Sequence, residues 1–358
     1  MRGALSLAII MARELSTATG YIQFLRPMSL NAGRNDHNRI IGPSSGMAER
    51  ASQKPSRKGL TTVASSSSAP AIIDIDCNFL HPDMPPFPDL LSHPSTISSN
   101  IVGFVSPSSN LSESARMVEL LDGMNDDVNI RTTCGIHPYE VKPNEDLGAV
   151  ESTILSSLSS PFVACVGECG LDYSDGFPPS TDQLPVFELQ VEVAARTKSN
   201  LFLHTRAAHE DTLRVLKNVK EKHGGYLPPA VVHCFTGTPS DLEDYLSLGF
   251  YIGVTGFVLK PAGSDVLSCL SRIPKDRLMI ETDSPYMGFS NCRSTYAASD
   301  PTISLKTSKE RKKFIKTMYP NYPSSLPMVL EAVAKARGEG IEDVAKYTTN
   351  NAKNFFSL

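Results

Sequence analysis

The sequence feature that most constrains the fold is a series of eight short apolar runs, spaced along the chain after residue 70. They span 71–76, 100–105, 128–136, 162–168, 201–204, 230–233, 250–254 and 278–283. Short runs with continuous apolarity are typical of strands buried on both faces. Segments with the apolar spacing of amphipathic helices lie between them, as in 182–198 and 207–222. Eight strands alternating with helices predict an α/β fold of the (β/α)8 TIM-barrel class. An open doubly wound sheet is the alternative, although no glycine-rich nucleotide-binding loop follows the early strands.

Local signals predict where several helices begin and end. Asn110 followed by Glu113 predicts a capping box. Thr238, Pro239 and Asp241 stand in the order expected at the start of another helix. A helical apolar pattern begins at Leu326 and is closed by Gly338. The first connection, 82–99, is rich in Pro and Ser, which predicts an irregular first unit.

Cysteine usage and hydropathy restrict the class of protein. The seven cysteines form no C-x-x-C pair, and most lie inside apolar runs, which indicates reduced thiols in an intracellular protein rather than a disulfide or zinc-finger framework. No run approaches the roughly 18 apolar residues of a membrane span. The sequence therefore predicts no membrane-spanning segment.

The first 70 residues differ from the rest in charge. They hold nine Lys/Arg against three acids and end in a Ser-rich stretch, whereas residues 71–358 carry a net charge of about −10. This pattern predicts a disordered N-terminal extension at 1–70, read as a mitochondrial or plastid transit peptide. An untargeted tail on a cytoplasmic or nuclear protein is the alternative. The negative remainder argues against a broad duplex-binding surface.

Five of the predicted strands end in an imidazole or a carboxylate. His137, Glu168, His204, His233 and Asp283 stand at these ends. Active sites of barrels lie at the carboxyl ends of their strands, so we expect these side chains to meet. Imidazoles and carboxylates are ligands for a divalent cation, and the absence of a thiolate cluster argues against structural zinc. Such a site performs hydrolysis.

A series of motifs resembles the TatD family of metal-dependent deoxyribonucleases. The motifs are G-I-H-P at 135–138, V-G-E-C-G-L-D-Y at 166–173, L-H-T-R-A-A-H-E at 203–210, V-H-C-F-T-G-T at 232–238, Y-I-G-V-T-G at 251–256 and I-E-T-D-S-P-Y at 280–286. The resemblance implies a metal-dependent barrel hydrolase that acts on phosphodiesters. Its typical activity is a 3′ to 5′ exonuclease on the end of single-stranded DNA, with RNA as a further substrate. It also implies Glu168, His204, His233 and Asp283 as metal ligands and His137 as a catalytic or substrate-contacting residue.

The sequence departs from the family pattern at the first strand. Asp76 and Asn78 stand where many relatives have a His-x-His pair. Asp76 is suited to Mg²⁺, which we expect as the metal, with Mn²⁺ and Zn²⁺ as alternatives. We expect one tight site, with a second metal left open. Tyr139 replaces a frequent second His, and Pro320-Asn321-Tyr322-Pro323 replaces the family's Arg-Asn-Glu-Pro.

The predicted mechanism assigns the remaining roles. Asp283 orients or deprotonates the attacking water beside Glu168, and His137 and Arg206 hold the phosphate, with His209 and Asn78 as further substrate contacts. The basic run at 306–316 is either a solvated helix face or a track for backbone phosphates. Tyr173, Phe235 and Tyr286 either stack on bases or pack in the protein. We expect a monomer. The alternatives in function are a metal-dependent amide, ester or aminoacyl hydrolase and a non-catalytic nucleic-acid-binding relative.

Overall fold

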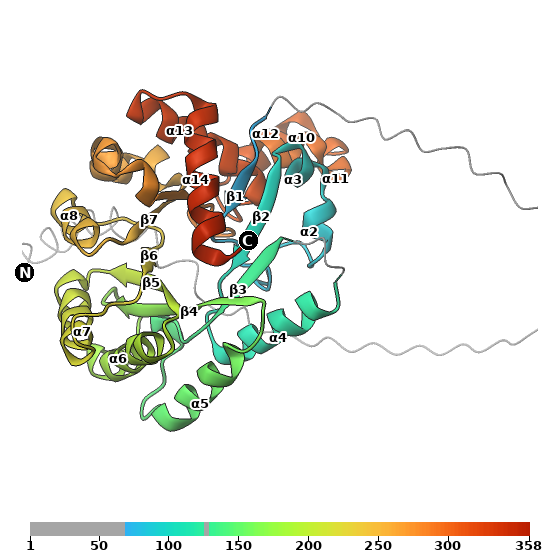
Figure 1. Cartoon of the computed structure of the whole chain (residues 1–358). Helices are drawn as coiled ribbons and strands as arrows, with labels where there is room; N and C mark the ends of the chain where they lie inside the picture. Colours follow the sequence, from blue (N-terminus) through green and yellow to red (C-terminus); the bar gives the residue numbers. More distant parts are fainter. Residues whose placement is uncertain (1–68, 125–128) are drawn as a thin grey trace, which may run out of the picture. The chain divides into compact units, whose positions relative to one another are not determined.

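Eight parallel strands form one sheet in which each strand pairs with the next along the chain (Figure 1). The computed structural model describes residues 69–124 and 129–358. The strands are β1 (Ile72–Asp74), β2 (Ile101–Ser106), β3 (Ile130–Cys134), β4 (Val163–Asp172), β5 (Asn200–Arg206), β6 (Ala230–Val232), β7 (Tyr251–Val254) and β8 (Leu278–Ile280). A parallel bridge between Cys77 and Ser284 joins the ends of the first and last strands. The eight-stranded barrel is confirmed, and the open doubly wound sheet is excluded.

Helices cover the outside of this sheet. Among them are α4 (Leu111–Asp122), α5 (Leu147–Ser157), α6 (Ser180–Thr197), α7 (His209–Lys222), α8 (Pro239–Ser247), α9 (Ser264–Cys269), α13 (Leu326–Arg337) and α14 (Ile341–Phe356). After β1 come α2 (Asp89–Ser92) and α3 (Pro94–Ser98), and after β8 come α10 (Ser294–Ser299), α11 (Pro301–Ser304) and α12 (Ser308–Lys316). Short 3₁₀ turns are η2 (Pro138–Glu140), η3 (Gly256–Leu259), η4 (Pro261–Gly263), η5 (Leu270–Arg272), η6 (Lys275–Arg277) and η7 (Pro323–Ser325). The first connection is irregular as predicted, since it holds two helices of about one turn each.

The helix ends agree with the sequence signals in all but one detail. Thr238 and Asp241 form a complete capping box at α8, and Gly338 ends α13 at φ 65°. The Asn110 side chain accepts the backbone N–H of Glu113 at α4, as expected. The Glu113 carboxylate, however, accepts the backbone N–H and hydroxyl of Ser109 instead of the N–H of Asn110. Half of the predicted box at this helix is therefore wrong, because the acid reaches one residue further back.

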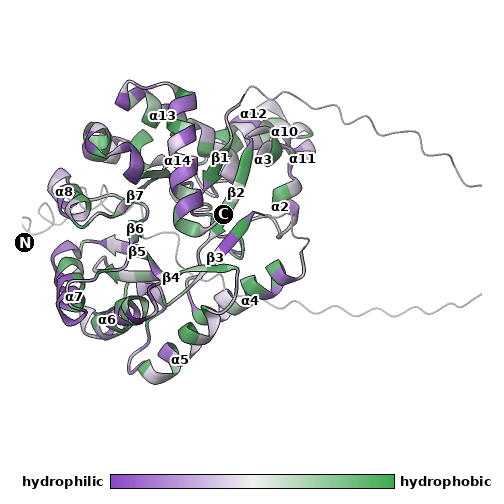
Figure 2. Cartoon of the chain, viewed as in Figure 1, coloured by the Kyte–Doolittle hydropathy of each residue, from purple (hydrophilic) through white to green (hydrophobic). Residues whose placement is uncertain are grey.

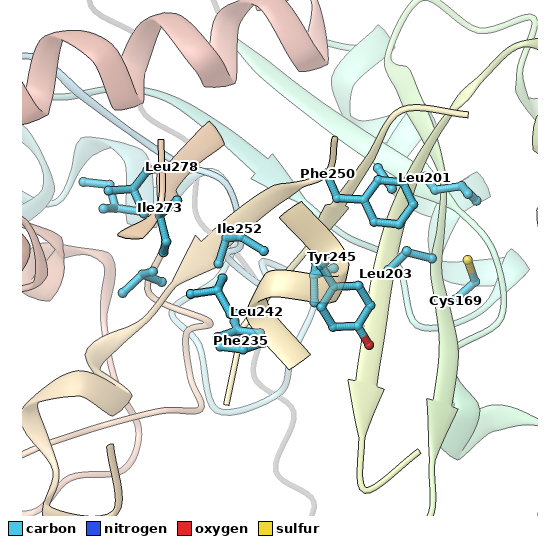
Figure 3. Close-up of a cluster of buried hydrophobic side chains, with 14 of the residues drawn as sticks. Cys169, Leu201, Leu203, Phe235, Leu242, Tyr245, Phe250, Ile252, Ile273 and Leu278 are labelled. Carbon is cyan, nitrogen blue, oxygen red and sulfur yellow. The ribbon is translucent and has the colours of Figure 1, made fainter. Parts of the chain in front are cut away.

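The outer layer of the core lies between the strands and the helices. Figure 2 shows β2 as largely apolar and α14 as mixed, as expected for a helix with one buried face. In Figure 3, Leu203 of β5 and Ile252 of β7 lie beside Leu242 and Tyr245 of α8. Among the described residues, no helix is both long and apolar enough to cross a membrane. The predicted extension at 1–70, apart from its last two residues, lies outside the described ranges.

The inner layer fills the barrel and supports the site. Its inward side chains are Ile73, Ile75, Val105, Cys165, Phe202, Val231 and Met279, joined by Ala352, Phe355 and Phe356 of α14. Phe202 stands between two neighbours in this layer. Its ring centroid lies 6.1 Å from that of Phe356 and 5.0 Å from that of His233. The last helix thus packs beneath the inward apolar layer, and the first polar side chains lie on top of that layer.

Candidate metal centre

Strand alternation brings the polar groups to the carboxyl end of the barrel. Because side chains two apart on a strand point to the same face, His204 follows Phe202 inward and His233 follows Val231. On the last strand Glu281 follows Met279 in the same way. Each polar residue is therefore two positions beyond a buried apolar one. The alternation of side chains along each strand therefore places apolar residues in the inner core and polar residues at the site.

Two glycines make room for Glu168 on β4. Gly167 has φ 145° and Gly170 has φ 153°, values that side-chain-bearing residues rarely adopt. A Cβ on Gly167 would lie 2.5 Å from the Phe202 carbonyl oxygen, and one on Gly170 would overlap the backbone of His204. The backbone of β4 therefore lies unusually close to β5 on both sides of the acid. This close approach holds Glu168 beside the histidine of the neighbouring strand.

One oxygen of Glu168 is the centre of the cluster. Glu168 Oε1 lies 2.7 Å from His233 Nε2, 3.1 Å from His204 Nδ1 and 3.4 Å from His137 Nε2. His204 Nδ1 is also 3.3 Å from His233 Nε2 and 3.3 Å from His137 Nε2. Four of the five residues predicted at strand ends therefore meet at one point.

The outer contacts of the two central histidines fix which ring nitrogens face the cluster. His204 Nε2 lies 3.0 Å from a carboxylate oxygen of Asp172, and His233 Nδ1 lies 2.9 Å from one of Asp76. Both nitrogens of each ring therefore face a carboxylate, and the neutral tautomer with its proton toward Asp172 or Asp76 is the one that leaves a lone pair toward Glu168. In that tautomer two nitrogen lone pairs and a carboxylate oxygen lie within 3.3 Å of one another, which is the arrangement that a cation needs.

This donor set fits a divalent cation. Ligands about 2.1 Å from a shared ion are themselves about 3 Å apart, which is close to the separations of these three atoms. Glu168, His204 and the nearby His137 form a group of acid and imidazole ligands within 4.8 Å of one another. The backing carboxylates, Asp76 and Asp172, orient the rings as they do in metal sites. The protein therefore has a candidate metal centre whose ligands are held in place before binding.

The charges of the cluster adjust to one another. Burial raises the pKa of Glu168, but His233 and His137 oppose this more strongly and hold it well below its usual range. Burial lowers the pKa of His233, whereas Glu168 and Asp76 raise it, with a net shift well above its ordinary value. The cluster therefore takes up a proton where a cation is not bound, and a cation must displace it.

A second group of acids lies on the other side of His233. Asp76, His233 and Glu281 offer ligand atoms within 4.8 Å of one another, and all three are buried. Burial raises the pKa of Glu281 to about 8, and one of its oxygens is buried without a hydrogen-bond partner. A Cβ on Gly253 would lie 2.7 Å from the other oxygen, so this glycine gives the carboxylate its space. Asp283 lies next to this group, and burial raises its pKa to about 6.

His137 differs from the other two imidazoles in the ring nitrogen that it points into the cluster. Its Nδ1 accepts the backbone N–H of Tyr139 at 3.1 Å, so the proton of the neutral ring is on Nε2. Burial lowers its pKa to about 4, which keeps the ring neutral at neutral pH. His137 therefore points an N–H donor into the cluster where His204 and His233 point lone pairs. A donor is suited to a phosphate oxygen more than to a cation.

The turn that carries Asp283 is held by buried contacts. Asp74 accepts the backbone N–H and hydroxyl of Thr282 at 2.8 and 2.6 Å, and Asp283 donates its backbone N–H to the Asp76 carbonyl at 2.9 Å. Asn321 donates its side-chain amide to the Thr282 carbonyl at 3.0 Å. Asp283 itself has φ 52°, a left-handed value that is uncommon outside glycine. Asn321 thus holds the turn that follows the last strand.

The predicted substrate contacts lie at different distances from the cluster. Asn78 donates its side-chain amide to Asp76 at 3.2 Å and to the Ser284 carbonyl at 3.1 Å, and lies 3.5 Å from Asp283. Arg206 ends β5 opposite Asp172 in the register. His209 faces α8, with its Nε2 3.0 Å from Asp244. Their roles toward a substrate stay predictions.

The aromatic residues offered for base stacking also differ in position. The Tyr173 hydroxyl donates to Asp211 at 2.7 Å, and Phe235 is 3% exposed in the outer core. Tyr286, in contrast, is partly exposed and contacts the His81 ring edge-on at 5.2 Å between centroids. Packing accounts for Phe235, while Tyr286 lies on the rim of the site.

Sequence reasoning misses two acids of the site. Asp172 escapes it because an acid after a strand also reads as a helix cap, and β4 runs four residues further than predicted. The sequence places Glu281 at the end of a strand but assigns it no role. Its spacing of two from Asp283 predicts that both side chains lie on the same face of that strand. The i, i+2 alternation on the last strand is the available signal.

A (β/α)8 barrel that gathers imidazoles and carboxylates at the carboxyl ends of its strands belongs to the class of barrel hydrolases. Residues 73–357 match the family described as TatD related DNase, so the chain belongs to that family. This confirms the predicted resemblance and the prediction of a hydrolase that acts on ester bonds.

Relatives and solved structures agree with this placement. The chain is 34% identical over 257 residues to the 3'-5' ssDNA/RNA exonuclease TatD of Edwardsiella piscicida, covering 72% of this chain and 88% of that protein. It is 32% identical over 228 residues to the protein of that name from Escherichia coli K12, covering 63% and 78%. Among solved structures, a TatD homologue from Escherichia coli K12 has a TM-score of 0.63 at 23% identity, covering 80% of this chain and 98% of its own. A TatD-family hydrolase from Entamoeba histolytica has a TM-score of 0.62 at 21% identity, covering 80% and 98%.

Proposed function

We propose that this protein is a divalent-cation-dependent exonuclease that removes nucleotides from the 3′ end of single-stranded DNA, with RNA as a further substrate. The observation that carries the proposal is the contact between Glu168 Oε1 and the lone-pair nitrogens of His204 and His233 at 3.1 and 2.7 Å. Relatives that share about a third of their residues with this chain bear the name 3'-5' ssDNA/RNA exonuclease. Their name supplies the polarity and the substrate class of the proposal.

In this proposal Glu168, His204, His233 and Asp283 hold Mg²⁺, with Mn²⁺ or Zn²⁺ as alternatives. When bound, the cation supplies a Lewis acid that polarises water and neutralises charge on the phosphate. Glu168, Asp76 and Glu281 supply carboxylate oxygens around His233, and a bound cation would favour their ionised forms. A second cation beside Asp76 and Glu281 stays an open part of the proposal.

The chain's own groups orient and deprotonate the reactants. Asp283, with its pKa raised by burial to about 6, is ionised at neutral pH and close enough to neutrality to accept the proton of the attacking water. His137 donates a hydrogen bond from its Nε2–H to a non-bridging phosphate oxygen, and Arg206 places its guanidinium on the same phosphate. The two contacts align the phosphorus for in-line attack by the water oxygen. As that P–O bond forms, the bond from phosphorus to the 3′ oxygen of the preceding nucleotide breaks, this oxygen takes a proton from solvent, and the terminal nucleotide leaves with a 5′-phosphate.

The test is the cleavage pattern of a 5′-labelled single-stranded oligonucleotide by the full chain with Mg²⁺ or Mn²⁺. We expect a ladder that shortens from the 3′ end, abolished by EDTA and by Glu168→Ala or His233→Ala. Glu210→Ala, on the exposed face of α7, is the matched control and should cleave like the wild type. A circular strand should resist cleavage because it has no end. Equal ladders from the wild type and both site variants, or a ladder without divalent cation, would contradict the proposal.

A further inference from the structure

The helix α12 carries a cationic face that nothing in the site accounts for. Lys309, Lys312, Lys313 and Lys316 follow the i, i+3, i+4, i+7 spacing, so they lie on one face, and all four are exposed. The stretch 306–316 holds six basic residues and one acid, a net charge of +5, within a chain whose remainder is acidic. Its single acid, Glu310, is engaged by the N–H and hydroxyl of Thr307 at 2.9 and 2.8 Å. We call these four lysines the cationic face.

The opposite side of α12 fixes the helix to the barrel. The Arg293 guanidinium lies 3.4 Å from the centroid of the Phe314 ring. Phe314 in turn lies 6.3 Å from Tyr296 of α10, which stacks on Tyr322 at 4.0 Å. No residue of α12 is fully buried, and Figure 1 shows it beside α10. The helix is therefore anchored through one aromatic residue while its lysines face away from the anchor.

A group of aromatic rings connects α12 to the metal centre. Tyr319 follows the helix, and its ring lies 6.3 Å from that of Tyr286 and 6.5 Å from that of His81. Tyr286 comes three residues after Asp283 and lies 5.2 Å from His81. All three rings are partly exposed. We call these three rings the aromatic group; it joins the Asp283 turn to the segment that ends α12.

We propose that the aromatic group and the cationic face form a track for single-stranded nucleic acid, on which the strand lies before its end enters the metal centre. Bases next to the reacting end stack on the aromatic group, and phosphates further along the strand contact the lysines. Base stacking on aromatic side chains contributes about 1–3 kcal/mol per base and tolerates any sequence. The cationic face spans about 10 Å along the helix, enough for about two or three consecutive phosphates. The inference rests on the proposed function and extends it.

Nucleic acid is favoured over a membrane surface as the ligand. A membrane-binding helix needs an apolar face beside its basic one. In α12 the apolar residues Phe314 and Ile315 are half-buried against the protein, so that face is already covered. The cationic face is also continuous with the aromatic group and the metal centre. A single strand of nucleic acid would contact all three, whereas a membrane surface would not.

The test compares binding and cleavage by three forms of the full chain. The first is the wild type, and the second replaces the four lysines of the cationic face by Ala. The third is a control that removes the same charge from exposed lysines elsewhere, by Lys217→Ala, Lys335→Ala, Lys346→Ala and Lys353→Ala. The probe is fluorescent oligo(dT) of about 12 nucleotides with phosphorothioate linkages at its 3′ end, followed by anisotropy at several salt concentrations. Cleavage of the unmodified strand is compared with cleavage of a dinucleotide.

The expected results are specific to the track. The cationic-face variant should bind about 10- to 100-fold more weakly, with a salt slope smaller by about 0.7 for each phosphate that a lysine no longer neutralises. Its ratio of kcat/KM for the long strand over the dinucleotide should fall, and the control variant should match the wild type. Tyr286→Leu should also reduce this ratio but leave the salt slope nearly unchanged, because stacking involves no counterion release.

Three other outcomes would either contradict the proposed track or show that the track and the proposed exonuclease activity are independent. Equal affinity and salt slope for the cationic-face variant and the wild type overturn the inference, even if both cleave. Weaker strand binding by that variant, with no cleavage by the wild type, supports the track and rejects the exonuclease. Binding to vesicles with anionic lipid that is abolished in the variant, with strand binding unchanged, assigns the face to membranes and overturns the inference.

Discussion

The side chain of Asn321 offers a sharp test of how the turn bearing Asp283 is held. Asn321 is fully buried and makes two side-chain hydrogen bonds, from its amide to the Thr282 carbonyl at 3.0 Å and from the Tyr322 N–H to its oxygen at 3.0 Å. Asn321→Ala leaves both backbone groups buried and unpaired. Each unpaired group costs about 1–3 kcal/mol, so we expect a decrease of about 2–6 kcal/mol in the free energy of unfolding.

The measurement is urea unfolding of the full chain, followed by circular dichroism. Asn218→Ala, on the exposed face of α7, is the matched control and should change the unfolding free energy by less than about 0.5 kcal/mol. Asn321→Asp keeps the shape but turns the donor into a carboxylate that faces the Thr282 carbonyl, so it should be at least as destabilising as the Ala variant. If Asn321→Ala unfolded at the same urea concentration as the wild type, the turn would not depend on this amide. The role given to Asn321 would then be wrong.

Three further predictions concern the metal centre, each measured by calorimetric titration with Mn²⁺. Asp172→Asn should weaken binding about 10- to 100-fold, because the variant lacks the carboxylate that orients His204; unchanged affinity would contradict this. Gly253→Ala places a methyl group 2.7 Å from Glu281 and should weaken binding about tenfold unless Glu281 takes no part. Burial lowers the pKa of His233, but Glu168 and Asp76 raise it well above its ordinary value, so protons compete with the cation and affinity should rise as the pH increases above about 6.5; a flat profile would refute the competition.

The sequence is sufficient to predict the strands because their signal is local. Each apolar run is buried on both faces, so continuous apolarity marks all eight, and the order along the chain implies the sheet order. The sequence pattern ends β4 too early, at Glu168, since Gly167 and Gly170 read as breaks. They are in fact positions where the strand continues against its neighbour. A glycine in an apolar run can mark the end of a strand or a place where a neighbouring backbone comes close. Only the position of the next strand distinguishes the two.

The site is predictable in its residue types and less so in its contacts. Strand ends predict His137, Glu168, His204 and His233, and the structure brings these four together. Which ring nitrogen faces inward depends on acids from other strands, such as Asp172, and no spacing in the sequence encodes that pairing. His209 lies within a motif that resembles the family's, yet its ring contacts α8.

The packing of the last helix beneath Phe202 and His233 has a consequence for biosynthesis. Phe356, which lies against Phe202 inside the barrel, is made 154 positions later. At about 5–20 residues per second, the ribosome needs roughly 8–30 s to cover that distance. For the last 123 positions of this interval the nascent chain holds the four clustered residues His137, Glu168, His204 and His233, but not the Phe356 ring that packs beneath Phe202 and His233. The packing beneath the metal centre is therefore completed only once α14 has been synthesised, and we expect a product truncated before α14 to carry the ligands without this support.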